Sequence, residues 1–244
     1  MLPFGRQDID AVFLDAGNTL ITLDHGLVCE VLAAEGLRVQ PAVLARAEAA
    51  ARPAVSRMLG AGASSEQPDT FTFYVGRILE RLGGAAHDDD VGDRAVRVVR
   101  ALRHGVATQR LWSQVLPGVP EALQLLRDAG LSLVVVSNSD GTVEDGLASL
   151  GLRTLLHGVV DSAVVGAEKP DPAIFRHALD LAGTEPDRAV HVGDLFSVDV
   201  LGARAAGLHA VLLDPYGDWD DVDCPRAPDL RSLAHALVNG GNRP

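Results

Sequence analysis

Residues 11–20 read Ala-Val-Phe-Leu-Asp-Ala-Gly-Asn-Thr-Leu: a short apolar run, then an acid and a polar turn. Further apolar runs of strand length, rich in Val and Leu, lie at Leu133–Val136, Ala189–Val192 and Ala210–Leu213. None of them alternates strictly between polar and apolar residues, which is typical of strands buried on both faces in a parallel sheet.

Helix-length segments separate these runs and end at glycines that are typical of helix C-termini. They are Pro120–Ala129, Thr142–Leu150, Pro172–Ala182 and Ser197–Ala206. Asp171 and Pro172 form an N-cap and first-turn pair at the start of the third segment. The alternation of strands and helices predicts an α/β fold, with a parallel sheet flanked by helices and right-handed crossovers.

The region from about Asp24 to Arg110 follows a different pattern, in which no segment reads as a strand. Four helices are predicted there, at Gly26–Glu35, Pro41–Leu59, Thr70–Leu82 and Asp90–Arg103. We therefore expect an α/β core made of residues 1–23 and 111–244, and an all-helical domain at residues 24–110 inserted after the first strand. The acidic run His87–Asp90 is predicted to be a solvated loop, because consecutive side chains point in different directions.

The composition excludes several classes of protein. The 244 residues carry 33 acidic and 21 basic side chains, a net charge of −12, which repels nucleic-acid backbones. Two cysteines are too few for a disulfide framework, and no apolar stretch is long enough to cross a membrane. We expect a cytoplasmic protein, monomeric or homodimeric, with neither nucleic acid nor membrane as a partner.

Residues with chemical function follow the apolar runs. In an open parallel sheet the carboxyl ends of the strands form the ligand-binding edge, so these residues would share one crevice. They supply carboxylates, a hydroxyl and an amine: Asp15, Ser137, Lys169, Asp194 and Asp199.

Together these motifs, in this order, resemble the haloacid dehalogenase superfamily, in the subfamily with a helical cap after the first motif (the C1 cap of subfamily IA). The resemblance covers about Val12 to Pro215, and the helical insertion falls where that cap belongs. It implies a Rossmann-like core and a Mg²⁺-dependent hydrolase, most simply a phosphatase of a small phosphorylated metabolite.

The resemblance also implies roles for individual residues. Asp15 stands at the position of the nucleophile that forms an aspartyl-phosphate. Mg²⁺ would be held by Asp15, Asp194 and the main-chain carbonyl of Gly17. Lys169 would neutralise phosphate charge and keep the nucleophile ionised.

Three further residues complete the expected site. The Ser137 hydroxyl and the Asn138 backbone N–H would bind phosphate oxygens alongside Lys169. Asp199 would orient a metal-bound water or Lys169; the alternative is that it only complements a helix dipole.

The first motif departs from the family pattern at Gly17, where a second Asp usually transfers protons. General acid–base catalysis contributes about 10²- to 10⁴-fold, so its loss has consequences. Three interpretations stay open: a leaving group that needs no proton, a substitute donor such as His25 or Glu168, or a poor catalyst that mainly binds a phosphorylated ligand. Asn18, at a position that is usually glycine, is interpreted as a turn residue.

A metal-free haloacid dehalogenase is the other enzymatic alternative, since those enzymes also lack the second Asp. They usually have an aromatic residue there and lack the Gly-Asp pair that this chain keeps at Gly193 and Asp194, so phosphate chemistry is favoured. His191 is interpreted as a packed strand residue. Residues on predicted helical faces of the insertion are interpreted as mostly solvated: Arg52, Arg57, Tyr74, Arg77 and Arg81. The alternative is that they line the inner face of the cap, where Arg77 or Arg81 would meet a substrate anion.

Overall fold

A computed structural model describes residues 2–64, 67–83 and 91–240. The chain divides into two compact units, one of Met1–Ile21 with Val115–Pro244 and one of Thr22–Gln114. The chain passes between them at β2 (Ile21–Thr22) and β3 (Gln114–Val115), which form a two-stranded sheet. The predicted loop His87–Asp90 lies outside the described residues.

The first unit is built on a six-stranded sheet in the order β5-β4-β1-β6-β7-β8, with every neighbouring pair parallel. This confirms the predicted α/β class. The strands are β1 (Ala11–Leu14), β4 (Ser132–Ser137), β5 (Gly158–Asp161), β6 (Ala189–Gly193), β7 (His209–Leu213) and β8 (Arg226–Ala227). The edge strands β5 and β8 were not predicted, because runs this short carry little apolar signal.

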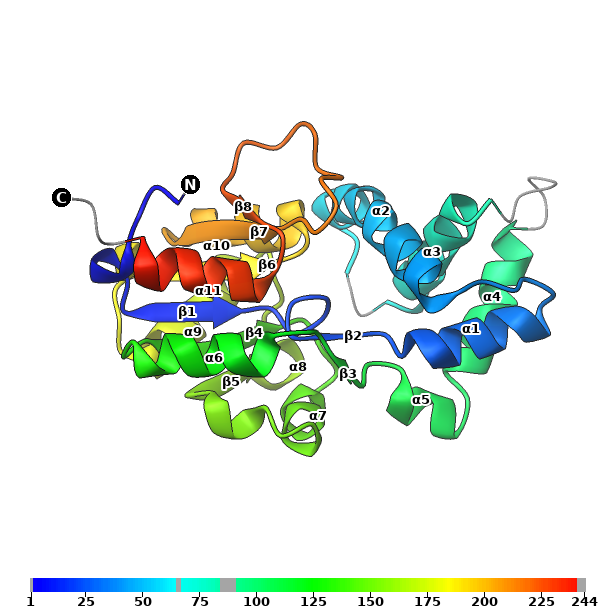
Figure 1. Cartoon of the computed structure of the whole chain (residues 1–244), viewed down its shortest axis with the longest axis horizontal. Helices are drawn as coiled ribbons and strands as arrows, with labels where there is room; N and C mark the ends of the chain where they lie inside the picture. Colours follow the sequence, from blue (N-terminus) through cyan, green and yellow to red (C-terminus); the bar gives the residue numbers. More distant parts are fainter. Residues whose placement is uncertain (1, 65–66, 84–90, 241–244) are drawn as a thin grey trace. The chain divides into compact units, whose positions relative to one another are not determined.

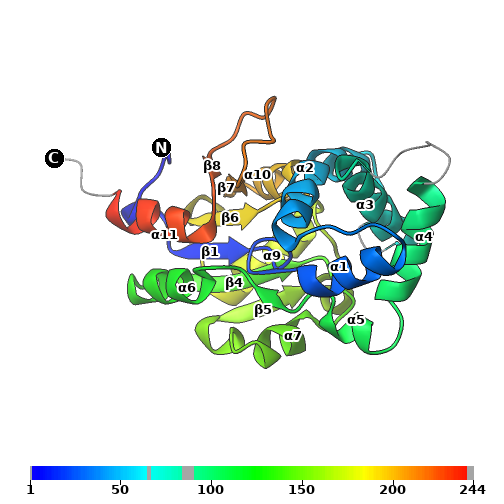
Figure 2. The ribbon, with the colours of Figure 1, turned by 45° about the vertical axis from the view of Figure 1, so that its right-hand side comes forward.

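Helices cover both faces of the sheet, α6 and α11 on one and α9 and α10 on the other (Figure 1). Figure 2 shows the parallel strands running between these layers. Phe13, Val134 and Phe175 are among the residues that pack the core on the α9 side. The helices and turns of this unit are η1 (Arg6–Asp8), α6 (Val119–Asp128), α7 (Val143–Ser149), η3 (Arg153–Leu155), α8 (Ser162–Val165), α9 (Pro172–Ala182), η4 (Pro186–Arg188), η5 (Phe196–Val200), α10 (Leu201–Ala205) and α11 (Leu230–Asn239).

The helix predicted over Ser197–Ala206 begins differently from the prediction. Its first part is a π-helical turn, η5, and only Leu201–Ala205 is α-helical. The wider turn closes where the Leu201 N–H donates to the Phe196 carbonyl five residues earlier. Just before it, the Asp199 side chain accepts from the Leu195 N–H at 2.9 Å. Such turns often occur at functional sites.

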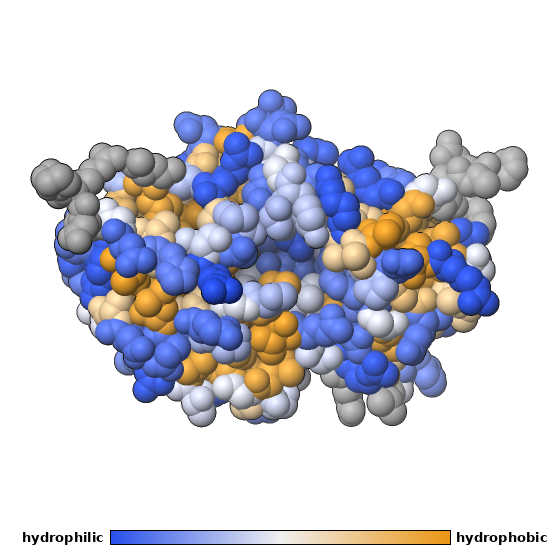
Figure 3. Space-filling model, viewed as in Figure 1, coloured by the Kyte–Doolittle hydropathy of each residue, from blue (hydrophilic) through white to orange (hydrophobic). Residues whose placement is uncertain are grey.

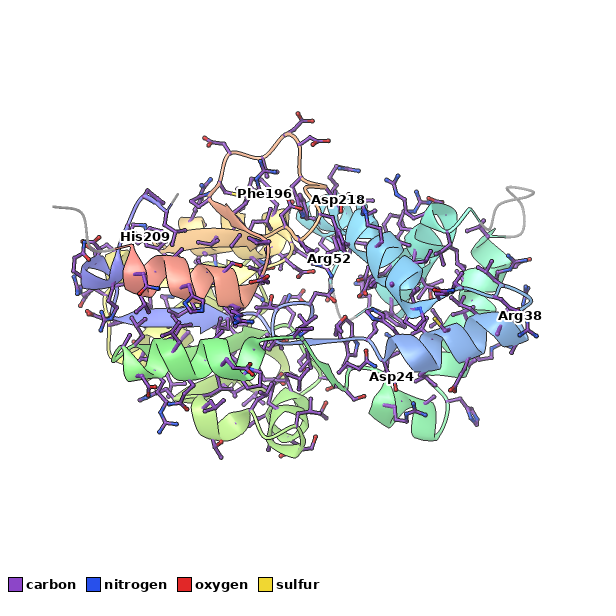
Figure 4. All side chains as sticks on the ribbon, viewed as in Figure 1. Asp24, Arg38, Arg52, Phe196, His209 and Asp218 are labelled. Atoms are coloured by element: carbon purple, nitrogen blue, oxygen red, sulfur yellow. The ribbon has the colours of Figure 1, made fainter. Side chains whose placement is uncertain are left out.

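The inserted unit is helical, as the sequence predicts. Asp24, labelled in Figure 4, precedes the first helix. It caps this helix by accepting from the Leu27 N–H at 2.9 Å, and it pairs with Arg110 at 2.7 Å. The core of the inserted unit includes Leu32, Leu44 and Leu102, all buried. The helices are α1 (His25–Ala34), α2 (Pro41–Gly60), α3 (Pro68–Arg81), α4 (Val91–Leu102) and α5 (Val106–Arg110).

The surface carries both hydrophilic and hydrophobic side chains. On the face drawn in Figure 3, hydrophilic side chains surround smaller hydrophobic patches on each unit. Within the described parts of the chain, no helix combines the length and the apolar character needed to cross a bilayer.

Candidate active site

The carboxyl ends of three adjacent strands bring together residues that are far apart in the sequence. β1 lies between β4 and β6, with Leu14 opposite Val135 and Val192. The Asp15 N–H continues this ladder by donating to the Val192 carbonyl at 2.9 Å. Side chains that follow β1 and β6, or that end β4, therefore share one edge of the sheet.

Lys169 pairs with two of the carboxylates at this edge. Its Nζ donates to Asp15 Oδ1 at 2.6 Å and to Asp199 Oδ1 at 2.7 Å. Lys169 and Asp199 are almost fully buried. Burial opposes the charge on Lys169, but the two carboxylates raise its pKa above the usual range, so it stays protonated. Asp199 is thus placed beside Lys169, and its expected role in orienting Lys169 or a metal-bound water stays a prediction.

The two carboxylates differ in how strongly they hold their charge. Burial raises the pKa of Asp15 to about 6, with Lys169 opposing the rise and Asp199 adding to it. Burial acts on Asp199 as well, but Lys169 and the hydrogen bond from His191 hold the pKa of Asp199 well below its usual range. Both groups are therefore mainly ionised at neutral pH, as a nucleophilic Asp15 requires.

Asn138 makes a contact that sequence reasoning missed. Its side-chain Nδ2 donates to the Lys169 carbonyl at 2.9 Å, and its Oδ1 accepts from the Lys169 N–H at 2.7 Å. The amide thus fixes the main chain of the residue whose ammonium pairs with Asp15. An Asn after a strand is common in turns for local reasons, so no feature of the sequence indicates its partner 31 residues away.

Ser137 ends β4 at this edge, and its side chain is buried. Its hydroxyl lies 3.5 Å from the Asn138 carbonyl, at the limit of a hydrogen bond. The roles expected for the Ser137 hydroxyl and the Asn138 N–H on phosphate oxygens stay predictions.

The residues expected to hold a metal ion have a suitable chemistry. Asp15 and Asp194 follow neighbouring strands, and Asp194 Oδ2 accepts from Asn18 Nδ2 at 3.2 Å. Asn18 has a φ of 54°, a left-handed conformation that Asn tolerates better than most residues, in agreement with its predicted turn role.

No group of three His, Cys, Asp or Glu side chains is placed to bind a metal within the described ranges. By their chemistry, the two carboxylates and the main-chain carbonyl expected at Gly17 would nevertheless suit Mg²⁺, which keeps several waters when bound. The donor set fits a hard divalent ion better than a tightly caged transition metal.

His191 is a packed strand residue, as predicted, and it also makes a polar contact that the sequence analysis did not predict. His191 is fully buried, and its Nε2 lies 3.0 Å from Asp199 Oδ1. It therefore belongs to the network around Lys169. The available signal was an imidazole within an otherwise aliphatic strand, eight residues before a buried acid.

The inserted unit contains its own buried polar cluster. Glu48 is buried, and its carboxylate accepts from the Tyr74 hydroxyl at 2.9 Å and contacts His25 Nε2 at 2.6 Å. Arg52 and Tyr74 are buried too, so the prediction that they lie on solvated faces is wrong for both. The reason is that α2 packs closely along α3. A proton-donor role for His25 or Glu168 stays a prediction.

Comparisons with known proteins agree with these motifs. A family model described as haloacid dehalogenase-like hydrolase matches residues 9–207. The human haloacid dehalogenase-like hydrolase domain-containing protein 3 is 33% identical over 240 residues, covering 95% of this chain and 94% of that protein.

Two further proteins are similar to the chain. Phosphoglycolate phosphatase 1 from Pseudomonas aeruginosa is 30% identical over 141 residues, covering 56% of this chain and 52% of the phosphatase. The structure of the HAD-hydrolase YfnB from Bacillus subtilis bound to magnesium aligns with a TM-score of 0.60 at 18% identity, covering 94% of this chain and 98% of YfnB.

Proposed function

The chain belongs to the haloacid dehalogenase-like hydrolases, and from this premise we propose that it hydrolyses a small phosphorylated metabolite through an aspartyl-phosphate on Asp15. The supporting observation is the Lys169 ammonium, held 2.6 Å from Asp15 and 2.7 Å from Asp199. This arrangement supplies a carboxylate nucleophile with a fixed positive charge beside it. A phosphoryl group carries negative charge, so it needs that compensation to approach a carboxylate.

In the first step, a carboxylate oxygen of Asp15 attacks phosphorus and the bond from phosphorus to the leaving oxygen breaks. The leaving group departs with the electron pair. Lys169 lies against Asp15 and would offset the charge on the phosphoryl oxygens, while Asp199 keeps Lys169 charged. In the second step, water attacks phosphorus and the bond to Asp15 breaks.

Asp15, Asp194 and the Gly17 carbonyl would hold Mg²⁺, which neutralises phosphoryl charge when it is bound. Asn18 supports this assignment, because its amide hydrogen bond to Asp194 Oδ2 fixes the carboxylate at the end of β6. In a metal-free dehalogenase, which attacks carbon, Asp194 would have no metal ion to bind.

Gly17 restricts the substrate. A glycine donates no side-chain proton to a departing oxygen, and alkoxide leaving groups need one. We therefore expect turnover of acyl or aryl phosphates, whose leaving groups are stable as anions, and slow turnover of alkyl phosphates, by a factor of about 10² or more.

The test is a phosphate-release assay with acetyl phosphate, para-nitrophenyl phosphate and glycerol phosphate, with Mg²⁺ or with a chelator. The first two should be hydrolysed only with Mg²⁺, and Asp15→Asn should be inactive. Asp180→Asn is the matched control, because Asp180 is exposed on α9.

Other outcomes would contradict the proposal. Release of halide from a 2-haloacid without metal would indicate that the protein is a haloacid dehalogenase and not a phosphatase. Binding of phosphorylated ligands without any turnover would indicate a non-catalytic binding protein. Fast turnover of glycerol phosphate would show that another residue donates the proton, and His25 would be the first to mutate.

The proposal also covers substrate selection, cellular location and oligomeric state. We assign substrate selection to the inserted helical domain, with the boundaries expected at residues 24 and 110, because a core shared by many hydrolases does not specify a substrate. We further propose that the protein is cytoplasmic and is a monomer or a homodimer. Light scattering after size exclusion would measure the oligomeric state.

A further inference from the structure

His191 is an unusual residue for its place in the fold. It lies on β6, opposite Phe13 of β1 and Ala210 of β7, and it is fully buried. The neighbouring strand positions hold Val190 and Val192. An aliphatic side chain would pack there without the cost of removing an imidazole from water. A buried polar ring at such a position therefore needs a specific role.

The ring is held in one orientation. The Phe175 ring packs edge-on against it, with centroids 5.1 Å apart and an interplanar angle of 80°. Nε2 points at Asp199 Oδ1, 3.0 Å away, and the same oxygen accepts from Lys169 Nζ at 2.7 Å. His191 and Lys169 thus share one oxygen of Asp199.

The other contacts of Asp199 leave it little freedom. Its Oδ2 accepts from the Leu195 N–H at 2.9 Å. A Cβ on Gly193 would lie 2.2 Å from Asp199 Cγ, so the strand itself comes as close as glycine permits. The orientation of this carboxylate therefore depends on a small set of neighbours, among which His191 supplies a hydrogen-bonding side chain from strand β6.

The geometry also determines where the proton of His191 resides. An ionised carboxylate only accepts hydrogen bonds, so Nε2 must carry the hydrogen. Nδ1 is buried and makes no hydrogen bond with the residues that the structure describes. A second proton on Nδ1 would be a buried donor without an acceptor, which costs about 1–3 kcal/mol. Burial, together with the charge of Lys169, lowers the pKa of His191 although Asp199 opposes this.

We propose that His191 is a positioning residue: its neutral ring, protonated at Nε2, holds Asp199 in the orientation that keeps Lys169 against Asp15. The chain of contacts runs from His191 through Asp199 and Lys169 to the nucleophile. His191 touches no reacting atom itself. The kinetic consequence rests on the proposed phosphatase function, whereas the hydrogen bond and the tautomer do not.

The kinetic test compares two substitutions at this position. His191→Leu removes the donor and should lower kcat by about 10- to 100-fold, the usual effect of losing such a supporting contact, with KM little changed. His191→Gln places an amide N–H near the position of Nε2 and should restore most of kcat. Phe175→Leu is the control, since it loosens the packing of the His191 ring but leaves the Nε2 donor in place. It should lower the thermal midpoint while changing kcat less than His191→Leu does.

Two kinetic results would overturn the proposal. One is a His191→Leu variant that keeps the parent kcat. The other is an equal loss in His191→Leu and His191→Gln, which would show that packing rather than hydrogen bonding matters at this position.

A second measurement separates this inference from the proposed function. Nitrogen-15 NMR of the histidine-labelled protein, with His191→Gln to assign the signal, reports the protonation of each ring nitrogen. We expect a neutral ring with hydrogen on Nε2 at pH 7. Hydrogen on Nδ1 alone, or on both nitrogens, would overturn the proposal even in an active enzyme. If the parent protein hydrolyses none of the three phosphorylated substrates, the proposed function fails. The NMR result alone then decides whether His191 donates to Asp199.

Discussion

Asp15 should destabilise the folded protein at neutral pH, and Asp15→Asn should reveal by how much. The side chain is only 14% exposed, and burial raises its pKa from 3.8 to about 6 despite the nearby Lys169. Between these two pH values the folded state binds more protons at Asp15 than the unfolded state does. The free energy of unfolding must therefore fall as the pH rises through this window.

The magnitude follows from the size of the shift. Two pH units at 1.36 kcal/mol each give about 3 kcal/mol, lost progressively between pH 4 and pH 6. Asn resembles a protonated Asp in shape and carries no charge, and the Lys169–Asp199 pair stays in place. Asp15→Asn should thus be more stable than the parent by about 3 kcal/mol above pH 6, and nearly equal to it at pH 4.

The assay is urea denaturation between pH 4 and pH 7.5, followed by the fluorescence of Trp112 and Trp219. A chelator must be present, because a metal ion bound by ionised Asp15 would stabilise the folded state and hide the effect. Asp180→Asn is the control: as an exposed substitution on α9 it should change stability by less than about 0.5 kcal/mol at every pH.

A stability difference that does not change with pH would refute the reasoning, and so would an Asp15→Asn variant less stable than the parent at pH 7. The first result would mean that the attraction of Lys169 balances the effect of burial on the Asp15 pKa, and the second that the attraction outweighs burial. The expected result is the reverse, a catalytic carboxylate kept at the expense of stability, as is common at active sites.

Three other substitutions test separate parts of the structure. Gly193→Ala places a Cβ 2.2 Å from Asp199 Cγ, so it should lower stability by about 1–3 kcal/mol and kcat by about tenfold or more, measured by urea denaturation and steady-state kinetics; parent-like values would show that Asp199 can move aside. Gly17→Asp should raise kcat/KM for glycerol phosphate by about 10²-fold relative to acetyl phosphate, and an unchanged ratio would exclude Gly17 as the cause of substrate selection. Tyr74→Phe removes the hydroxyl that donates to buried Glu48 at 2.9 Å and should cost about 1–3 kcal/mol in denaturation experiments; the exposed Tyr216→Phe is its control, and equal effects would contradict the importance of this contact.

Much of the fold could be predicted because its signals are local. A strand buried on both faces needs a short run of aliphatic residues, and the runs at β1, β4, β6 and β7 meet that need without reference to the rest of the chain. Asp171 and Pro172 mark the start of α9 in the same local way. The sequence also placed Asp15, Ser137 and Asp194 at one edge, because parallel strands bring their carboxyl ends to the same side of a sheet.

The tertiary structure alone decided which polar groups meet. Asn138 pairs with the main chain of Lys169 and His191 with Asp199, and neither pairing follows from spacing along the chain. Glu48 and Tyr74 belong to helices whose sequences leave open which face is buried, and the packing of α2 along α3 settles that. Apolar periodicity is a property of neighbours in sequence. The partner and charge of a buried polar group depend on residues that only folding brings within 3 Å.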